Sequence, residues 1–215
     1  MQIYFSRLQP ELPADAWEDL RDRIPSNLRS RNDRFHFIED RQRNLFGLLL
    51  VAKCWEDHVA STFDFNTIVY DNNRRPYLKG SELDFNISHS GQYVICTMSA
   101  EGRVGIDVEF KKAVDLEDFR NTMNDTQWSE IKCSPDPLDK FFQYWTIKES
   151  VIKADGRGLS VPLTDIVVEK NTVNYDGKVW YLYPFAIDHD HKCCLASDQV
   201  INTPQITEVQ WQEFK

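Results

Sequence analysis

The sequence predicts a mixed fold in which helices and antiparallel strands occupy separate stretches of one chain. Apolar residues recur at helical spacing in residues 30–60 and 138–154. Apolar and polar residues alternate, as on strands with one buried face, between residues 86 and 109 and again beyond residue 165. With 215 residues, 41% of them hydrophobic, the chain can bury the core of one larger domain or of two small ones.

The N-terminal part is expected to contain one strand and two or three helices. Residues 1–8 favour a strand, and residues 13–23 a short helix that Pro25 ends. The apolar positions of residues 30–60 fit one helix, or two with a break. Residues 74–77 are expected to be extended, because a proline disfavours a helical residue before it.

The rest of the chain is expected to begin with a meander and to end in a second group of strands. Residues 86–109 read as three strands, with a first turn at residues 88–91. A loose connection leads to a helix over residues 138–154, which Gly156 ends. Further antiparallel strands are expected at residues 165–169, 173–175, 179–187 and 193–197.

The composition excludes several classes of protein. The formal net charge of −9 argues against general binding to nucleic acid. No apolar run approaches the ~20 residues that span a bilayer. Residues 1–5 lack the basic and then apolar pattern of a signal peptide, so we expect a cytoplasmic protein that does not bind membranes. The five cysteines show no C-x-x-C spacing, which argues against a structural zinc site.

A run of arginines interrupts this acidic chain. Residues 21–43 contain seven arginines and four acids. Such a run can be a solvated helix face, but the guanidinium fork also fits phosphate oxygens. Arg41 and Arg43 stand near the start of the long helical stretch, where free backbone N–H groups favour anions. A phosphorylated ligand is therefore the sharper of the two interpretations.

The candidate chemistry begins at Asp107 and Glu109. They share one face of the third strand of the meander, roughly 6.7 Å apart along it, so both carboxylates can lean toward one hard cation. The alternative is a strand that leaves the core and ends in solvated acids.

Two other segments carry groups that suit the same chemistry. Glu149 and Lys153 share one face of the helix over residues 138–154, although alone they would read as a helix salt bridge worth ~0.3 kcal/mol. His89 lies in the turn after the first strand of the meander, where a lone histidine often serves only as a hydrogen-bonding residue. Taken together, these acids and cations fit Mg²⁺-assisted transfer at a phosphorus centre, where positioning and charge neutralisation supply most of the rate.

Three motifs, in this order, resemble the signatures of the Sfp-type 4'-phosphopantetheinyl transferases. They are Phe85-Asn-Ile-Ser-His-Ser90 with Gly91, then Gly105-Ile-Asp-Val-Glu109, then Trp145-Thr-Ile-Lys-Glu-Ser-Val-Ile-Lys153 followed by Gly156-Arg-Gly-Leu159. The pairs Arg34-Phe35, Glu39-Asp40 and Arg75-Pro76, and Arg43, also resemble the N-terminal part of that family. The resemblance covers about residues 28–165.

The resemblance implies an α+β fold of two similar halves, related by a pseudo-twofold axis, with the active site in the cleft between them. Residues 1–104 would form the half on the 3'-phosphate and adenine side of coenzyme A, and residues 105–215 the metal and catalytic half. The implied reaction transfers the 4'-phosphopantetheine of coenzyme A to a serine hydroxyl of an apo acyl or peptidyl carrier protein and releases adenosine 3',5'-bisphosphate. Relatives are frequently monomeric and serve secondary metabolism, so we expect a monomer; polyketide, nonribosomal-peptide, siderophore and fatty-acid pathways all stay open.

The resemblance also assigns roles to single residues. Asp107, Glu109 and Glu149 match the ligands of Mg²⁺, which Mn²⁺ could replace. Glu149 is also the expected base, while Lys153 and His89, with Ser88, would hold the pyrophosphate. The residues expected to grip the 3'-phosphate and adenine end are Arg31, Arg43 and Arg75. Replacing Arg75 should then raise KM for coenzyme A and spare dephospho-coenzyme A.

Some points depart from the family pattern or stay open. Leu28 stands where a basic residue is often found, and Gln127 where relatives often carry glutamate. The alternatives to a transferase are a non-catalytic module that binds coenzyme A or a carrier protein, and another Mg²⁺-dependent enzyme that cleaves phosphodiesters. Four apolar residues directly follow the acidic strand and are expected to dock the carrier protein: Val114, Leu116, Phe119 and Met123.

Overall fold

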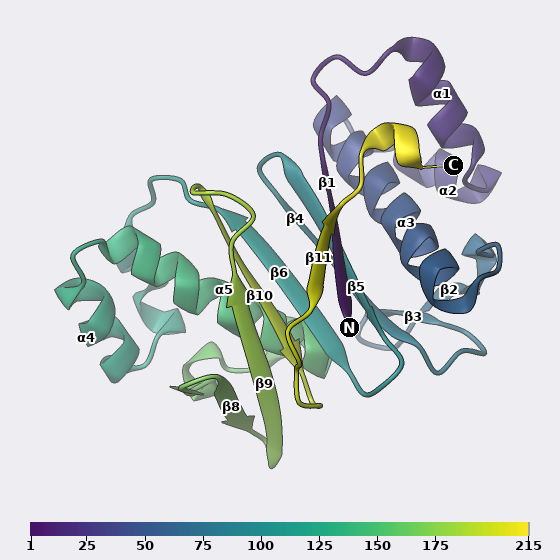
Figure 1. Ribbon diagram of the computed structural model, residues 1–215. Coiled ribbons are helices and arrows are strands. Elements are labelled where there is room, and N and C mark those ends of the chain that lie inside the picture. The colour runs from purple at the N-terminus through teal and green to yellow at the C-terminus, as the bar shows by residue number, and fades with distance from the viewer. Residues whose placement is uncertain (215) are drawn as a thin grey trace.

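The computed structural model describes residues 1–214, which form two main sheets lying side by side (Figure 1). The first sheet has the order β11-β1-β5-β4, with β1 (Gln2–Arg7), β4 (Asp84–Ser90), β5 (Tyr93–Ser99) and β11 (Gln205–Glu208). The second has the order β6-β10-β9-β8-β7, with β6 (Val104–Phe110), β7 (Val168–Glu169), β8 (Thr172–Tyr175), β9 (Lys178–Phe185) and β10 (His191–Ser197). A small hairpin pairs β2 (Ile68–Tyr70) with β3 (Pro76–Leu78).

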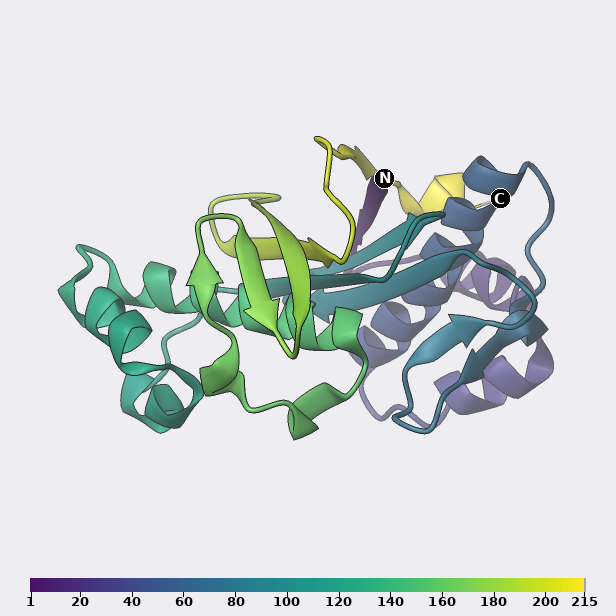
Figure 2. The same cartoon turned by 90° about the horizontal axis from the view of Figure 1, so that it is seen from below.

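Each main sheet is covered by one long helix. The α-helices are α1 (Ala14–Asp22), α2 (Ser26–Asn32), α3 (Ile38–Val59), α4 (Asp125–Cys133) and α5 (Pro137–Asp155). Helix α3 packs on β5, and α5 packs on β6 and β10. Figure 2 shows the helices of residues 14–59 at one end of the molecule and the helical segment of residues 116–133 at the other, with the teal strands between them. The predicted α+β fold class is confirmed, while the pseudo-twofold axis stays a prediction.

Local sequence signals explain where the long helices begin and end. Asp136 accepts a hydrogen bond from the backbone N–H of Asp139 (2.9 Å) and so caps α5, whose first residue is a proline. Gly156 ends α5 in the left-handed region, at φ 89°. The stretch predicted at residues 30–60 is two helices, α2 and α3, separated by residues 33–37. No helix within residues 1–214 combines the length and the hydropathy that crossing a bilayer requires.

The third strand of the predicted meander does not stay with the other two. Strand β6 pairs with β10 and begins the second sheet, so the meander prediction is wrong at this point. The edge of β6 that faces β4 is held by side chains of β4, which accept hydrogen bonds from its backbone N–H groups. The pairs are Asp84 with Val104 (2.8 Å), Asn86 with Ile106 (3.0 Å), Ser88 with Val108 (3.4 Å) and Ser90 with Phe110 (3.1 Å). This polar ladder joins the two sheets along the strand that carries the candidate acids.

Helix α4 and strands β2 and β11 were not predicted from the sequence. Helix α4 begins with a capping box, in which Asn124 and Gln127 bond each other's backbone N–H groups. Strand β11 pairs in parallel with β1, and Phe214 beyond it joins the core under α3. The chain therefore returns to the first sheet after it has built the second. A division into halves at residues 104 and 105 stays a prediction.

Candidate active site

Strand β6 brings Asp107 to the junction of the two sheets, where the residue is only 3% exposed. Its Oδ1 accepts hydrogen bonds from Lys153 Nζ (2.6 Å) and from Ser88 Oγ (2.9 Å). Its Oδ2 is buried and has no hydrogen-bond partner within residues 1–214. Because an unpaired buried carboxylate oxygen is unfavourable, a cation or a further donor at this atom would be stabilising.

Glu109 lies two residues further along β6 and is held at both carboxylate oxygens. Ser90 donates to Oε2 (2.8 Å), and the indole N–H of Trp145 donates to Oε1 (3.2 Å). Each oxygen keeps a lone pair, so the carboxylate can still bind a cation while these contacts fix its direction. Ser90 and Trp145 are missing from the predicted site. The signal for Ser90 was a polar residue at every second position of β4.

Glu149 reaches the same place from α5, which lies unusually close to β6. A Cβ on Gly105 would lie 2.1 Å from the backbone oxygen of Ser150 and 2.4 Å from the backbone nitrogen of Ala154, so only glycine permits this approach. Burial raises the pKa of Glu149; Lys153 opposes the rise, and the negative charge of Glu109 adds to it. Acids from two distant segments are therefore near neighbours.

The same interactions act on Asp107. Burial raises the pKa of its carboxyl to about 7, with Lys153 opposing the rise and Glu109 and Glu149 adding to it. The structure thus places Glu109 and Glu149 close enough to Asp107 for their charges to act on it, and the ammonium of Lys153 bonds Asp107 directly. Two neighbouring carboxyls with raised pKa values, here those of Asp107 and Glu149, are typical of functional sites.

The fit of this cluster to a divalent metal can be judged from its donors. No group of three or more His, Cys, Asp or Glu side chains among the described residues is arranged to hold a metal ion. The donors are nevertheless carboxylate oxygens, the ligands that Mg²⁺ prefers, and Asp107 Oδ2 is an orphaned buried acceptor. The residues present fit Mg²⁺, and ligation by the three acids stays a prediction.

Basic side chains surround the acids on the β4 side. Besides Asp107 and Ser88, Lys153 Nζ bonds the backbone oxygen of Ile106 (3.3 Å). His89 is exposed near the end of β4, and its pKa is lowered by partial desolvation and then by the positive charges of Lys153 and Arg43. These groups form a region of positive potential beside the carboxylates, which suits a ligand with several phosphates.

The predicted phosphate-binding arginines occupy three different environments. Arg43 donates to Asp40 (2.7 Å) and to the backbone oxygen of Gly91 (2.7 Å), and with His89 it lines a cavity of about 240 Å³. Arg31 is exposed on α2, where it donates to the hydroxyl of Tyr70 (2.7 Å). The structure therefore brings Arg43 to His89 and leaves Arg31 beside the β2–β3 hairpin.

Arg75 is buried and already surrounded by acceptors. Its guanidinium bonds both carboxylate oxygens of Asp84 (2.7 Å each) and the backbone oxygens of Lys153 and Val104 (2.9 Å each). These contacts link the segments of β3, β4, β6 and α5. Its exposed neighbour Arg74 lines a cavity of about 270 Å³ next to Lys153.

Of the four residues expected to dock the carrier protein, Met123 lies in the core, and Val114, Leu116 and Phe119 are partly buried against it. Met123 is 1% exposed, so its place on a docking surface is wrong. Phe119 packs against Phe141 and Trp145, with ring centroids 4.9 Å and 5.5 Å away. Leu116 joins the same cluster. The connection after β6 thus covers α5.

Gln127 stabilises local structure in the second half of the chain. Besides capping α4, its amide donates to the backbone oxygen of Ile166 (3.0 Å). The buried ammonium of Lys148 bonds the same oxygen (3.1 Å). Both side chains therefore fix the loop before β7.

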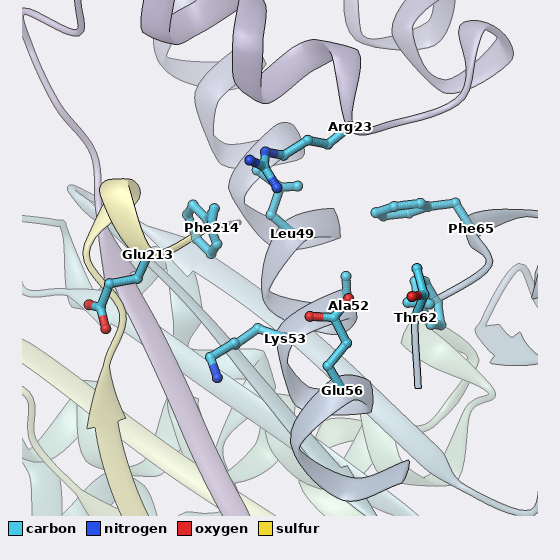
Figure 3. A pocket seen from close by; sticks show the side chains of 10 residues that line it. Arg23, Leu49, Ala52, Lys53, Glu56, Thr62, Phe65, Glu213 and Phe214 are labelled. Atoms are coloured by element: carbon cyan, nitrogen blue, oxygen red, sulfur yellow. The ribbon is translucent and has the colours of Figure 1, made fainter. Parts of the chain in front are cut away.

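Larger cavities lie outside this cluster. One of about 420 Å³ lies between α3 and the C-terminal segment and is lined by Arg23, Leu49, Phe65 and Phe214, among others (Figure 3). Another of about 580 Å³ is lined in part by Ile38 and Arg43. None of the three acids lines either cavity.

Comparison with known proteins identifies the family. Residues 103–196 match the 4'-phosphopantetheinyl transferase superfamily, and residues 10–101 match the N-terminal region of 4'-phosphopantetheinyl transferases. The chain is 29% identical over its whole length to the 4'-phosphopantetheinyl transferase Sfp of Bacillus subtilis, all of which is covered. It is 30% identical to another Bacillus subtilis 4'-phosphopantetheinyl transferase, over 78% of this chain and 76% of that relative. It is 31% identical to the L-aminoadipate-semialdehyde dehydrogenase-phosphopantetheinyl transferase of Schizosaccharomyces pombe, over 74% of this chain and 72% of that relative. The chain belongs to the 4'-phosphopantetheinyl transferase superfamily, among its Sfp-type members.

Proposed function

We propose that this chain transfers the 4'-phosphopantetheine of coenzyme A to a serine hydroxyl of an apo acyl or peptidyl carrier protein, with Mg²⁺ held by Asp107, Glu109 and Glu149. Its family makes it a 4'-phosphopantetheinyl transferase, an enzyme that acts on coenzyme A and a carrier protein. The observation that supports the metal proposal is the buried, unpaired oxygen of Asp107, a carboxylate on which the charges of Glu109 and Glu149 also act.

In this reaction a bond forms between the serine oxygen and the phosphorus that carries pantetheine. The bond from that phosphorus to the oxygen that leaves with adenosine 3',5'-bisphosphate breaks. Glu149 accepts the serine proton, directly or through a water molecule. When bound beside the acids, Mg²⁺ supplies positive charge that neutralises and orients the pyrophosphate.

The basic residues hold the substrate in place for this step. Lys153 and His89 bind pyrophosphate oxygens, and Ser88, which already bonds Lys153 (2.8 Å), assists them. Arg43, with Arg31 further out, binds the 3'-phosphate and adenine end. Positive groups that are fixed before the substrate arrives stabilise charge that develops in the transition state.

We also propose that the protein works in the cytoplasm as a monomer, in secondary metabolism. The cysteines at positions 54, 96, 133, 193 and 194 are free thiols, which supports a reducing compartment. The similarity to Sfp supports a role in secondary metabolism, where the proposed carrier protein belongs to nonribosomal-peptide or polyketide synthesis.

Mass spectrometry of an apo carrier protein tests the function. The carrier is incubated with this protein, coenzyme A and Mg²⁺, and a carrier whose acceptor serine is alanine serves as the control. We expect a phosphopantetheine adduct on the serine and none on the control. An unmodified carrier with intact coenzyme A would point to a binding module, and cleaved coenzyme A without an adduct would point to a phosphodiesterase.

We expect Glu149→Gln to lower kcat by at least ~10²-fold, because it removes the proposed base and one negative charge from the cluster. The steady-state rate with saturating coenzyme A and carrier measures this loss. Glu169→Gln, on an exposed residue of β7, is the matched control and should retain the wild-type rate. Full activity of the Glu149 variant with Mg²⁺ present would remove the base assignment.

Ser90→Ala should weaken divalent-metal affinity by about tenfold, because Glu109 loses the donor that fixes its Oε2. Titration with Mn²⁺ measures the affinity, and chemical denaturation measures the accompanying change in stability. Ser30→Ala, on an exposed residue of α2, is the control. Equal Mn²⁺ affinity in the Ser90 variant and the wild type would show that Ser90 does not orient a metal ligand.

A further inference from the structure

We propose that Arg75 is a positioning residue: paired with Asp84, it fixes the end of α5 that carries Lys153, and it does not bind the 3'-phosphate of coenzyme A. This inference rests on the proposed function, since it concerns the same site. It departs from the role that family resemblance gives Arg75.

The guanidinium of Arg75 has no donor left for a ligand. Nε bonds the backbone oxygen of Lys153, Nη1 bonds Asp84 and the backbone oxygen of Pro76 (3.4 Å), and Nη2 bonds Asp84 and the backbone oxygen of Val104. An arginine has five N–H groups, and each of these has an acceptor. The side chain is 6% exposed. A phosphate could bind only by displacing one of these buried contacts.

The pair of Arg75 and Asp84 takes the place of a neighbouring strand at the start of β6. Asp84 accepts a hydrogen bond from the backbone N–H of Val104 (2.8 Å), while Arg75 donates to the backbone oxygen of the same residue. The backbone N–H and C=O of Val104, on the edge of β6, are therefore both satisfied by one ion pair. The pair is thus built into the junction of the two sheets, where breaking it would leave buried polar groups unsatisfied.

Arginine side chains also complete the C-terminal end of α5. The last carbonyl groups of a helix lack partners within the helix. In α5, Arg75 donates to the backbone oxygen of Lys153, and Arg103 donates to those of Ala154 and Asp155 (3.2 Å each). A Cβ on Gly156 would lie 2.8 Å from Cδ of Arg75 and 2.6 Å from Nη2 of Arg103, so the glycine lets both side chains cross the helix end.

The position of this helix end decides where the ammonium of Lys153 lies. Lys153 belongs to the last turn of α5: its backbone oxygen is held by Arg75 and its Nζ by Asp107. Releasing the backbone oxygen lets the last turn fray and move Nζ away from Asp107 and from the pyrophosphate that it is proposed to hold. A displacement of about 1 Å in a positioning group can cost on the order of 10² in rate.

The test compares Arg75→Lys, Asp84→Asn and the double variant with the wild type, on coenzyme A and on 3'-dephospho-coenzyme A. Rates are measured below the unfolding temperature of every variant. We expect kcat with coenzyme A to fall at least ~10-fold in each variant, and kcat/KM to fall by the same factor for both substrates, because the 3'-phosphate contact is untouched. The proposal would be overturned if kcat/KM fell tenfold more for coenzyme A than for 3'-dephospho-coenzyme A, or if only the KM for coenzyme A rose.

Thermal unfolding provides a readout that does not depend on activity. Since Arg75 and Asp84 act as one unit, we expect the unfolding temperature of the double variant to lie only slightly below that of either single variant. Arg74→Gln, which removes the same charge from the exposed neighbour, should leave the unfolding temperature unchanged. Additive losses from Arg75 and Asp84 would overturn the pairing. If Arg75→Lys does not fold, Asp84→Asn carries the kinetic comparison, because its carboxylate is not a phosphate ligand.

The wild type in the same assay separates this proposal from the proposed function. Absence of transfer by the wild type contradicts the proposed function. The unfolding temperatures of the single and double variants then still decide whether Arg75 and Asp84 are coupled. Suppose instead that the wild type transfers phosphopantetheine and that the Arg75 variant loses kcat/KM for coenzyme A but not for 3'-dephospho-coenzyme A. That result contradicts only the positioning role.

Discussion

Asp107→Ala should abolish phosphopantetheine transfer while the protein still folds. The substitution removes the carboxylate whose Oδ2 is buried and has no hydrogen-bond partner among the described residues. This oxygen is the one best placed to bind a metal ion. It also removes the counter-ion of Lys153, whose ammonium lies 2.6 Å from Oδ1. Loss of one preorganised electrostatic group commonly costs ~10²–10³-fold in kcat, and here two proposed functions depend on one carboxylate.

Asp107→Asn separates charge from shape. The amide can still accept a hydrogen bond from Ser88 or Lys153, but it binds a divalent cation far less well. We expect this variant also to lose transfer, and Mg²⁺ to raise the unfolding temperature of the wild type but not that of the variant, because a ligand stabilises only the form that binds it. Retention of wild-type activity by Asp107→Asn would mean that the negative charge is not needed.

Gly105→Ala should have the largest combined effect on stability and activity. The added Cβ would meet two backbone atoms of α5 at 2.1 Å and 2.4 Å, and backbone atoms within a helix cannot move aside singly. Helix α5 must then shift away from β6. Forced overpacking typically costs about 1–3 kcal/mol of folding free energy, and the shift separates Glu149 and Lys153 from Asp107. We expect transfer to fall by at least ~10²-fold in the protein that still folds.

Gly47→Ala is the matched control for stability. Gly47 lies in α3, and a Cβ there would be 3.4 Å from its nearest side-chain neighbour, which is ordinary contact. Alanine should therefore keep or raise the unfolding temperature, since it favours a helix interior by about 1 kcal/mol over glycine. If Gly105→Ala unfolds like Gly47→Ala and keeps its activity, the close packing of α5 on β6 is not what assembles the site.

The sequence predicted those elements whose pattern is local. Helix α5 and the hairpin of β4 and β5 follow from apolar spacing, capping residues and a glycine turn. Strand β11 has no such signal, because its pairing with β1 joins residues about 200 positions apart. The departure of β6 from the meander is equally non-local, since its partner β10 lies far along the chain.

The candidate site was predictable to the same degree. Asp107 and Glu109 could be placed on one strand face, and Glu149 with Lys153 on one helix face, because each pair lies within one element. The contacts of Ser90 with Glu109 and of Arg75 with Lys153 cross between elements, so no spacing in the sequence reports them. A polar residue at every second position of β4 was visible, but its meaning depended on β6 lying beside it.

The crystal structure of the protein with Mn²⁺ and coenzyme A, with the metal located from its anomalous scattering, tests the central claim most directly. The account predicts one Mn²⁺ bound by carboxylate oxygens of Asp107, Glu109 and Glu149, beside the pyrophosphate. A metal bound elsewhere, or Glu149 turned away from the other two acids in that complex, would contradict it.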